Sequence, residues 1–303
     1  MKKLMFAAAV MSAFAVIAAD AAKTTDSAAE KPAEVEAQEK SIFSAYANYG
    51  FYSGYQLYGS IVNTEPVLQS YAEVLAALSW DDLDLGQLSV GLWHNSDLTG
   101  KRNDSLRRAF NEFDFNIAWR RMFWFDDDKT WGIFYKSYVV WYFYPHTGAN
   151  RPNTKTTFDW DHYFELANPY VVPYINIVHE YAQSDGNLLQ FGLKRDFQIC
   201  DGLSITPFVE CVWRNRNYGW CFSNFGNDPE GRKIDQGLAT FKVELDANYW
   251  FSKNVGIFAK VAFCTNLDPN LREACDYARD TYGAAYGRDN EFVWGGVGIQ
   301  VAF

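Results

Sequence analysis

Beyond its first 21 residues, the sequence has no long uninterrupted hydrophobic run. A helix that crosses a bilayer needs about 20 mostly apolar residues, so the rest of the chain is not expected to cross a membrane as helices. Cysteine is scarce, and no two cysteines form a Cys-x-x-Cys pair. The sequence therefore gives no support to thiol redox catalysis.

Positive charge is also in short supply. Lysine and arginine together number 27 against 37 aspartates and glutamates, which leaves a net charge of −10. No basic stripe runs along any segment, and this disfavours nucleic acid as a partner.

Recognisable metal and cofactor motifs are missing as well. The acidic run at 126–128 lacks the alternate spacing of a calcium loop. Oxygen ligands also occur at Asn224, Asn227, Asp228 and Glu230, but these are common loop residues. The sequence predicts no metal site and no cofactor.

The N-terminus has the pattern of a secretory signal. Lys2 and Lys3 precede an alanine-rich apolar stretch that ends in the small-x-small motif Ala19-Asp20-Ala21. We interpret residues 1–21 as a signal peptide, with a membrane-spanning helix as the alternative. Residues 22–41 are rich in alanine, glutamate and lysine and lack aromatics, so they are predicted to form a disordered acidic tether.

Aromatic residues are abundant from Ile42 onward. They make up 18% of the chain, although its mean hydropathy is only −0.26. Residues 238–251 alternate with period two: Phe241, Val243 and Leu245 share one face, while charged and polar residues occupy the other. A soluble sandwich shows such a pattern with its apolar face inward. A membrane barrel shows it with its apolar face toward lipid.

Similar runs predict about twelve strands. Most are longer than the usual globular strand of about 5–6 residues and match the roughly 9–11 that a tilted membrane strand needs. They are expected near 43–58, 67–80, 85–97, 108–123, 130–144, 157–167, 170–181, 188–197, 203–214, 238–251, 255–264 and 292–303.

The connections alternate in length. Tight turns are predicted at 81–84, 126–129, 168–169, 200–202 and 252–254, and mostly longer segments separate the other strands. Outer-membrane barrels have short periplasmic turns and long outer loops. The sequence thus predicts, over residues 42–303, an all-β fold: a single closed antiparallel transmembrane barrel with both termini periplasmic. A soluble secreted β-sandwich is the rival fold.

The chain ends on Phe303, after a strand with alternating apolar residues. This ending resembles the C-terminal assembly signal of Gram-negative outer-membrane barrels. The first hairpin also resembles that of an uncharacterised bacterial outer-membrane family, through Ser53, Tyr55, Gly59, Ser60 and Pro66. Tyr58 stands where that family commonly has arginine. The resemblance implies an outer-membrane location, lipid surroundings and the barrel-assembly machinery as a partner.

The polar faces of the strands supply the candidate functional residues. If the barrel is inverted, these charged side chains line its lumen, and the excess of acids favours small polar or cationic solutes. A narrow porin-like channel and a filled structural or surface-binding barrel both fit, because twelve strands lie between packed and open barrels. The predicted lining consists of Glu73, Glu112, Asp114, Arg120, Lys136, Asp159, Asp161, Glu165, Glu180, Lys194, Glu210, Arg214, Lys242, Glu244, Asp246 and Lys260.

An outer-membrane lipid hydrolase is the alternative function. Such chemistry needs a serine and a histidine in contact, with a third orienting group. Two histidines near the loop ends of strands have a serine and an acid close by: His94 with Ser96 and Asp97, and His179 with Glu180 and Ser184. Because no motif accompanies them, the sequence favours a protein that is not an enzyme, with no catalytic residues.

Two features of the long loops remain. Cys221, Cys264 and Cys275 are expected on the loop side, so a disulfide between two of them is plausible in an exported protein. Residues 270–280 are expected to form a short helix, either over the mouth of the barrel or on its surface.

Overall fold

The computed structural model describes residues 42–57, 60–81, 83–98, 112–143, 156–182, 185–218, 236–273, 276 and 290–303. The predicted signal peptide and tether lie outside these ranges. Within them, no helix is long and apolar enough to cross a bilayer.

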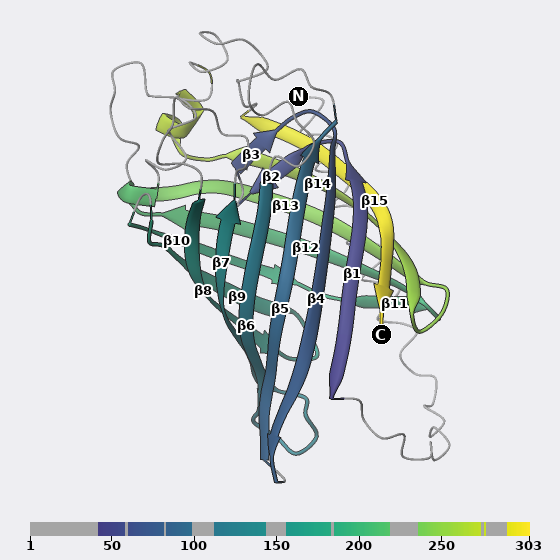
Figure 1. Ribbon diagram of the computed structural model, residues 1–303. Coiled ribbons are helices and arrows are strands. Elements are labelled where there is room, and N and C mark those ends of the chain that lie inside the picture. Colours follow the sequence, from purple (N-terminus) through teal and green to yellow (C-terminus); the bar gives the residue numbers. More distant parts are fainter. Residues whose placement is uncertain are drawn as a thin grey trace. The chain divides into compact units, whose positions relative to one another are not determined.

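The strands form a closed antiparallel barrel with twelve strand positions (Figure 1). Each long strand pairs with its neighbour along the chain, so the topology is up-and-down. The wall contains β1 (Phe43–Tyr52), β4 (Val67–Trp80), β5 (Leu83–Asp97), β6 (Glu112–Trp124), β7 (Gly132–Phe143), β8 (Thr156–Ala167), β9 (Val172–Glu180), β10 (Gly186–Lys194), β11 (Phe197–Cys200), β12 (Leu203–Arg214), β13 (Gly237–Trp250), β14 (Val255–Asn266) and β15 (Glu291–Ala302).

One strand position is interrupted. β10 pairs with both β9 and β12, and β11 continues along β12 after a break at Arg195 and Asp196. The two strands therefore share one position in the wall. Thr206 donates a hydrogen bond to Asp196, which is exposed at the break.

The first and last strands close the barrel. β1 and β15 lie side by side in Figure 1 and pair in register from Tyr46 opposite Ala302 to Tyr52 opposite Gly296. Phe303 and Ala45 exchange two backbone hydrogen bonds of 2.9 Å. The flat apolar terminal strand is therefore not a free edge, and the predicted closure is confirmed.

The burial of side chains is inverted relative to a soluble domain. Along β13, Glu244 is buried inside, whereas Leu238 is exposed on the outer wall. On β5, Leu88, Val90 and Leu92 are exposed, while Ser89 between them is buried. A water-soluble sandwich buries its apolar face, so this wall has the arrangement of a barrel surrounded by lipid.

Large aromatic side chains ring the end of the barrel that carries the short connections, which we call the turn end. Trp80, Phe125, Tyr170, Phe251 and Phe303 are all strongly exposed there, next to turns or at the C-terminus. Aromatic girdles of this kind are typical of membrane–water interfaces.

Local hydrogen bonds build the turns. The carboxylate of Asp126 accepts the N–H groups of Thr130 and Trp131 at 2.9 and 3.0 Å. The amide oxygen of Asn168 accepts those of Tyr170 and Val171 at 3.0 and 3.1 Å. Asp126, part of the acidic run at 126–128, therefore has a structural role in its turn.

The first strand is shorter than predicted. The alternating pattern indicated a strand over 43–58, but β1 ends at Tyr52. Tyr52 pairs with Val67, the first residue of β4. A longer β1 would have to pair Ser53 with Pro66, which has no N–H for the ladder. The chain instead forms a separate hairpin of β2 (Tyr55–Leu57) and β3 (Ser60–Asn63).

Candidate functional site: the barrel interior

Each charged residue predicted to line the lumen lies on the inner side of the wall, where its side chain is buried or only partly exposed. The strand alternation that exposes apolar side chains outside turns these side chains inward. The structure then connects many of them across neighbouring strands.

A continuous polar chain crosses the interior from β8 to β14, and we call it the polar belt. Its first half is formed by amides: Asn176 donates to Asp161 at 3.2 Å and to Gln190 at 2.9 Å, and Gln190 donates to Glu210 at 3.2 Å. Asn176 donates to both of its partners, whereas Gln190 accepts from Asn176 and donates to Glu210, so the two amides link Asp161 to Glu210 without direct contact.

The second half of the belt consists of ion pairs. Lys242 lies 3.7 Å from Glu210 and 3.2 Å from Glu244. Lys260 lies 3.3 Å from Glu244 and 3.5 Å from Asp246. Buried charges are tolerated when they are paired in this way.

Three aromatic rings accompany the belt, and we call them the aromatic stack. Tyr163 stacks on Tyr174 with centroids 5.6 Å apart, and Tyr174 stacks on Phe208 at 5.4 Å. The ammonium of Lys242 lies 4.4 Å from the centre of the Phe208 ring, and that of Lys194 lies 6.0 Å from the centre of Tyr163. A cation over a ring face is attracted by the ring quadrupole. The stack therefore has a lysine ammonium group over the ring at each of its ends.

The position of Tyr174 depends on a glycine. Tyr174 lies on β9, and its hydroxyl donates to Glu210 on β12 at 2.6 Å, across the intervening β10. The residue of β10 in register with both is Gly192. A Cβ at that position would lie 2.7 Å from the Tyr174 ring. Because Gly192 has no side chain, the Tyr174 ring has room to lie along the inner wall over β10 and reach Glu210.

Glycines on β1 and β15 serve the same purpose near the seam. A Cβ at Gly296 would lie 2.1 Å from the Tyr52 ring, and one at Gly298 would lie 2.5 Å from the Phe258 ring. These two rings pack with Trp294 in a buried aromatic cluster. The alternation of apolar residues did not predict this cluster, although the glycines at alternate positions of β15 leave room for its rings.

Another ion pair lies on β4 and β6. The guanidinium of Arg120 is 2.5 Å from the carboxylate of Glu73. On the adjacent β7, the ammonium of Lys136 lies 4.3 Å from the centre of the Tyr138 ring. The end of the barrel opposite the turn end carries the long connections, and we call it the loop end. There Arg214 lies 3.8 Å from Asp268.

Water reaches the two ends of the interior unequally. Asp161 is 0% exposed and Glu210 only 5%. In contrast, the side chains of Asp246 and Lys194, nearer the turn end, are 30% and 29% exposed. The remaining acids near the loop end, Glu112, Asp114, Asp159 and Glu180, are all buried. The interior is therefore tightly packed around the belt and more open toward the turn end.

The histidines named by the hydrolase alternative have different surroundings. His94 contacts serine hydroxyls through both ring nitrogens, with Nδ1 3.0 Å from Ser70 Oγ and Nε2 2.8 Å from Ser96 Oγ. Asp97, the acid proposed to accompany it, lies on the inner face of β5.

The contacts of His179 are to residues other than Glu180, its proposed acid partner. Its Nδ1 lies 2.8 Å from Asn187 Oδ1, and its Nε2 lies 3.3 Å from Asp185 Oδ1. Glu180 points inward, where it accepts a hydrogen bond from Thr157. Ser184 lies outside the described residues.

The cysteines require one correction. Cys264 was considered for a loop disulfide, but it is a free thiol buried inside the barrel, where it packs in the aromatic cluster. Neither pairing that uses Cys264 is formed. Cys221 and Cys275 lie outside the described residues.

The described residues include part of the predicted loop helix and none of the candidate metal ligands of residues 224–230. Among the described residues, no group of three acidic, histidine or cysteine side chains is arranged to hold a metal ion. Of the helix predicted over 270–280, residues 270–273 and 276 are described and helical, and Asp268 accepts the N–H groups of Asn270 and Leu271. The four candidate ligands between Asn224 and Glu230 lie outside the described residues.

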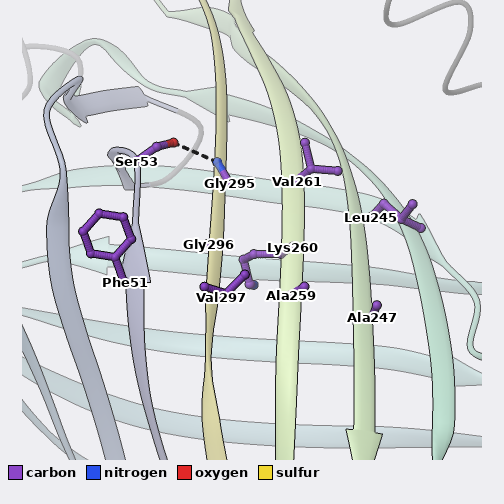
Figure 2. Close-up of a pocket in the computed structure, with 10 residues that line it drawn as sticks. All are labelled: Phe51, Ser53, Leu245, Ala247, Ala259, Lys260, Val261, Gly295, Gly296 and Val297. Atoms are coloured by element: carbon purple, nitrogen blue, oxygen red, sulfur yellow. Dashed lines mark hydrogen bonds between the residues drawn. The ribbon is translucent and has the colours of Figure 1, made fainter.

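An apolar hollow lies on the outer wall next to the seam (Figure 2). Phe51, Leu245 and Val297 surround a floor of small residues that includes Ala259 and Gly295. Ser53 closes the seam there: its backbone N–H donates to the Gly295 carbonyl, and its hydroxyl accepts the Gly295 N–H at 3.0 Å. The apolar lining suits hydrocarbon and no polar ligand.

Known structures resemble the chain, although no family model and no curated protein sequence matches it. An outer membrane channel from Pseudomonas putida F1 aligns over 91% of this chain and 100% of its own, with a TM-score of 0.48 and 10% identity. The NanC porin aligns over 86% and 98%, with a TM-score of 0.45 and 12% identity. Outer membrane phospholipase A from Escherichia coli aligns over 85% and 92%, with a TM-score of 0.42 and 10% identity.

Proposed function

We propose that the protein is a narrow porin-like channel of the bacterial outer membrane that passes small polar solutes and prefers cations. The observation that carries the proposal is the enclosed charged interior behind an apolar wall. A closed barrel with a polar lumen offers water and ions a path that the surrounding hydrocarbon does not.

The preference for cations follows from the balance of charge inside. Carboxylates outnumber ammonium and guanidinium groups on the inner face. Asp246 is the most informative of them, because it is partly exposed toward the turn end and forms an ion pair with Lys260. A ring of fixed negative charge in a narrow pore concentrates cations and repels anions.

The bore is narrow because the belt and the stack occupy it. The packing that leaves Asp161 and Glu210 almost inaccessible also favours the second candidate function, a filled barrel with a structural or surface-binding role. The two functions differ in one measurable property, since only the channel conducts.

The experiment is conductance of the refolded protein in a planar bilayer of neutral lipid with a KCl gradient. We expect small, discrete current steps and a reversal potential displaced toward that of K⁺. Asp246→Asn should reduce this displacement. The matched control is Asp127→Asn, which removes one carboxylate from an exposed turn and should leave it unchanged.

A silent bilayer, with a barrel shown to be folded by its heat-dependent gel migration, would favour the filled barrel instead. Equal effects of Asp246→Asn and Asp127→Asn would show that the inner carboxylates do not set the selectivity.

The location carries further proposals. Placing the turn end in the periplasm puts both termini of the barrel there, and Phe303 is then accessible to the assembly machinery. The likeness of the first hairpin to an uncharacterised outer-membrane family fits this location but identifies no permeant. Surrounding lipid is the main partner, and the acidic interior offers nothing to nucleic acid.

A further inference from the structure

Three polar side chains form a hydrogen-bonded chain on neighbouring strands of the wall. Ser70 on β4 contacts Nδ1 of His94 on β5 at 3.0 Å, and Ser96, two residues further along β5, contacts Nε2 at 2.8 Å. Ser70 and His94 are direct partners in the β4–β5 register. The arrangement is therefore set by strand pairing.

This group lies on the outer wall. His94 and Ser96 continue the alternation of the exposed Leu88, Val90 and Leu92. The ring of Phe113, in register on β6, lies 5.5 Å from the imidazole. Because β5 ends at Asp97, the group is close to the loop end. In an outer-membrane barrel the ends of the strands meet the lipid headgroups.

Polar side chains on a lipid-facing wall are costly, and an ionisable group there points to function unless it is needed for structure. The purely structural interpretation is that the three side chains satisfy one another's hydrogen-bonding groups. His162, also on the wall, shows such an arrangement, since its Nδ1 lies 2.9 Å from the hydroxyl of Tyr135. His94 differs because it has an aliphatic hydroxyl at each ring nitrogen.

These contacts match the requirements of nucleophilic catalysis. A serine becomes a nucleophile when a histidine accepts its proton, and a third group must hold the imidazole in the correct tautomer. If Nδ1–H donates to Ser70, then the lone pair of Nε2 is the acceptor in the 2.8 Å contact with Ser96, and it can take the proton of that hydroxyl. His94 is 8% and Ser96 6% exposed, so water competes little for these hydrogen bonds.

We propose that Ser96 and His94 form a hydrolytic site for acyl esters of membrane lipids, with Ser70 as a positioning residue. Ser96 Oγ attacks the ester carbonyl carbon while Nε2 takes its proton. The carbonyl reforms as the C–O bond to the lipid alcohol breaks, and His94 returns the proton to that alcohol. A water molecule then attacks the acyl carbon while His94 takes its proton, the bond between that carbon and Ser96 Oγ breaks to release the fatty acid, and His94 returns the proton to Oγ.

The first test is covalent capture by a fluorophosphonate, which needs only the nucleophile and its base. The refolded full-length barrel in detergent micelles should be labelled, and mass spectrometry should place the label on Ser96. Ser96→Ala should abolish this labelling, and His94→Asn should slow it by about 10²-fold or more. The matched control is His162→Gln, which removes a wall histidine that contacts tyrosine and should label normally.

The second test measures fatty acid release from two kinds of vesicle. One contains only glycerophospholipid, and the other contains lipopolysaccharide in addition, so the two arms identify the source of the ester. Ser70→Ala should lower kcat with little change in KM and shift the pH profile of kcat, and Ser70→Thr should restore both.

The result that overturns the proposal is a folded protein with neither labelling nor release, or labelling that persists in Ser96→Ala. A label on Ser70 would also overturn the assignment of roles, since the other tautomer makes Ser70 the hydroxyl that donates. Release requires no open lumen, so this outcome is independent of bilayer conductance.

Discussion

At the scale of single residues, the structure assigns opposite surroundings to neighbours in sequence. Leu245 is on the outer wall beside the apolar hollow, and Asp246 points inward to Lys260. Leu245 therefore faces the surroundings of the barrel, whereas Asp246 faces its polar interior.

This contrast gives a paired prediction. Leu245→Arg should prevent barrel assembly, because arginine on the lipid face near the bilayer midplane costs about 2–4 kcal/mol. Asp246→Asn should assemble normally, since the amide keeps the size and most hydrogen bonds of the carboxylate. The measurement is the fraction of heat-modifiable, folded protein after refolding into lipid vesicles. Equal yields of the two variants would contradict the facing of β13.

At the scale of strands and their contacts, the aromatic stack determines how much of the bore remains. Tyr174 reaches from β9 to β12 and fills the space that Gly192 leaves. The stack is thus a property of three strands together and of one missing side chain.

Removing the central ring should widen the channel. Tyr174→Ala is expected to raise single-channel conductance, because it opens the interior between Tyr163 and Phe208. Tyr49→Ala removes an exposed tyrosine from the outer wall and should leave conductance unchanged. If the two variants conduct alike, the stack does not form the constriction.

The sequence predicted most strands and their facing, because period-two alternation is a local property. It predicted β4 to the residue and the inward orientation of Glu244 and Lys260. The early end of β1 was missed because it depends on Pro66, the residue just before the neighbouring strand β4.

The outer-wall group shows the same limit. Alternation alone places Ser96 on the face of His94 and Asp97 on the other, so the wrong acid could have been set aside from sequence. Ser70 could not have been found, because its distance to His94 depends on the register between two strands. The register between two strands depends on the turn that joins them as well as on their facing, so alternation within each strand did not predict which side chains meet in the polar belt.

At the scale of the whole molecule, the C-terminal residue has two separable contributions. The backbone of Phe303 exchanges hydrogen bonds with Ala45, whereas its side chain is 74% exposed. The fold therefore needs the backbone at this position and not the phenyl ring.

Phe303→Ala should consequently refold in detergent as well as the unchanged protein and should keep its thermal stability. In a bacterial cell the same variant should accumulate poorly in the outer membrane, because the ring is the part that the assembly machinery is proposed to read. The measurements are gel migration after refolding and protein level in purified outer membranes. A loss of refolding in vitro would assign the ring to the fold instead.

The seam between β1 and β15 also has a consequence for biosynthesis. Tyr46 and Gln300, which share a hydrogen bond across it, are 254 positions apart in the chain. Until the residues of β15 have been made, β1 has no partner on that side, and its backbone groups stay available to any other strand. Closure of the barrel therefore has to wait for the strand that contains Gln300, and premature pairing of β1 with another strand would compete with it.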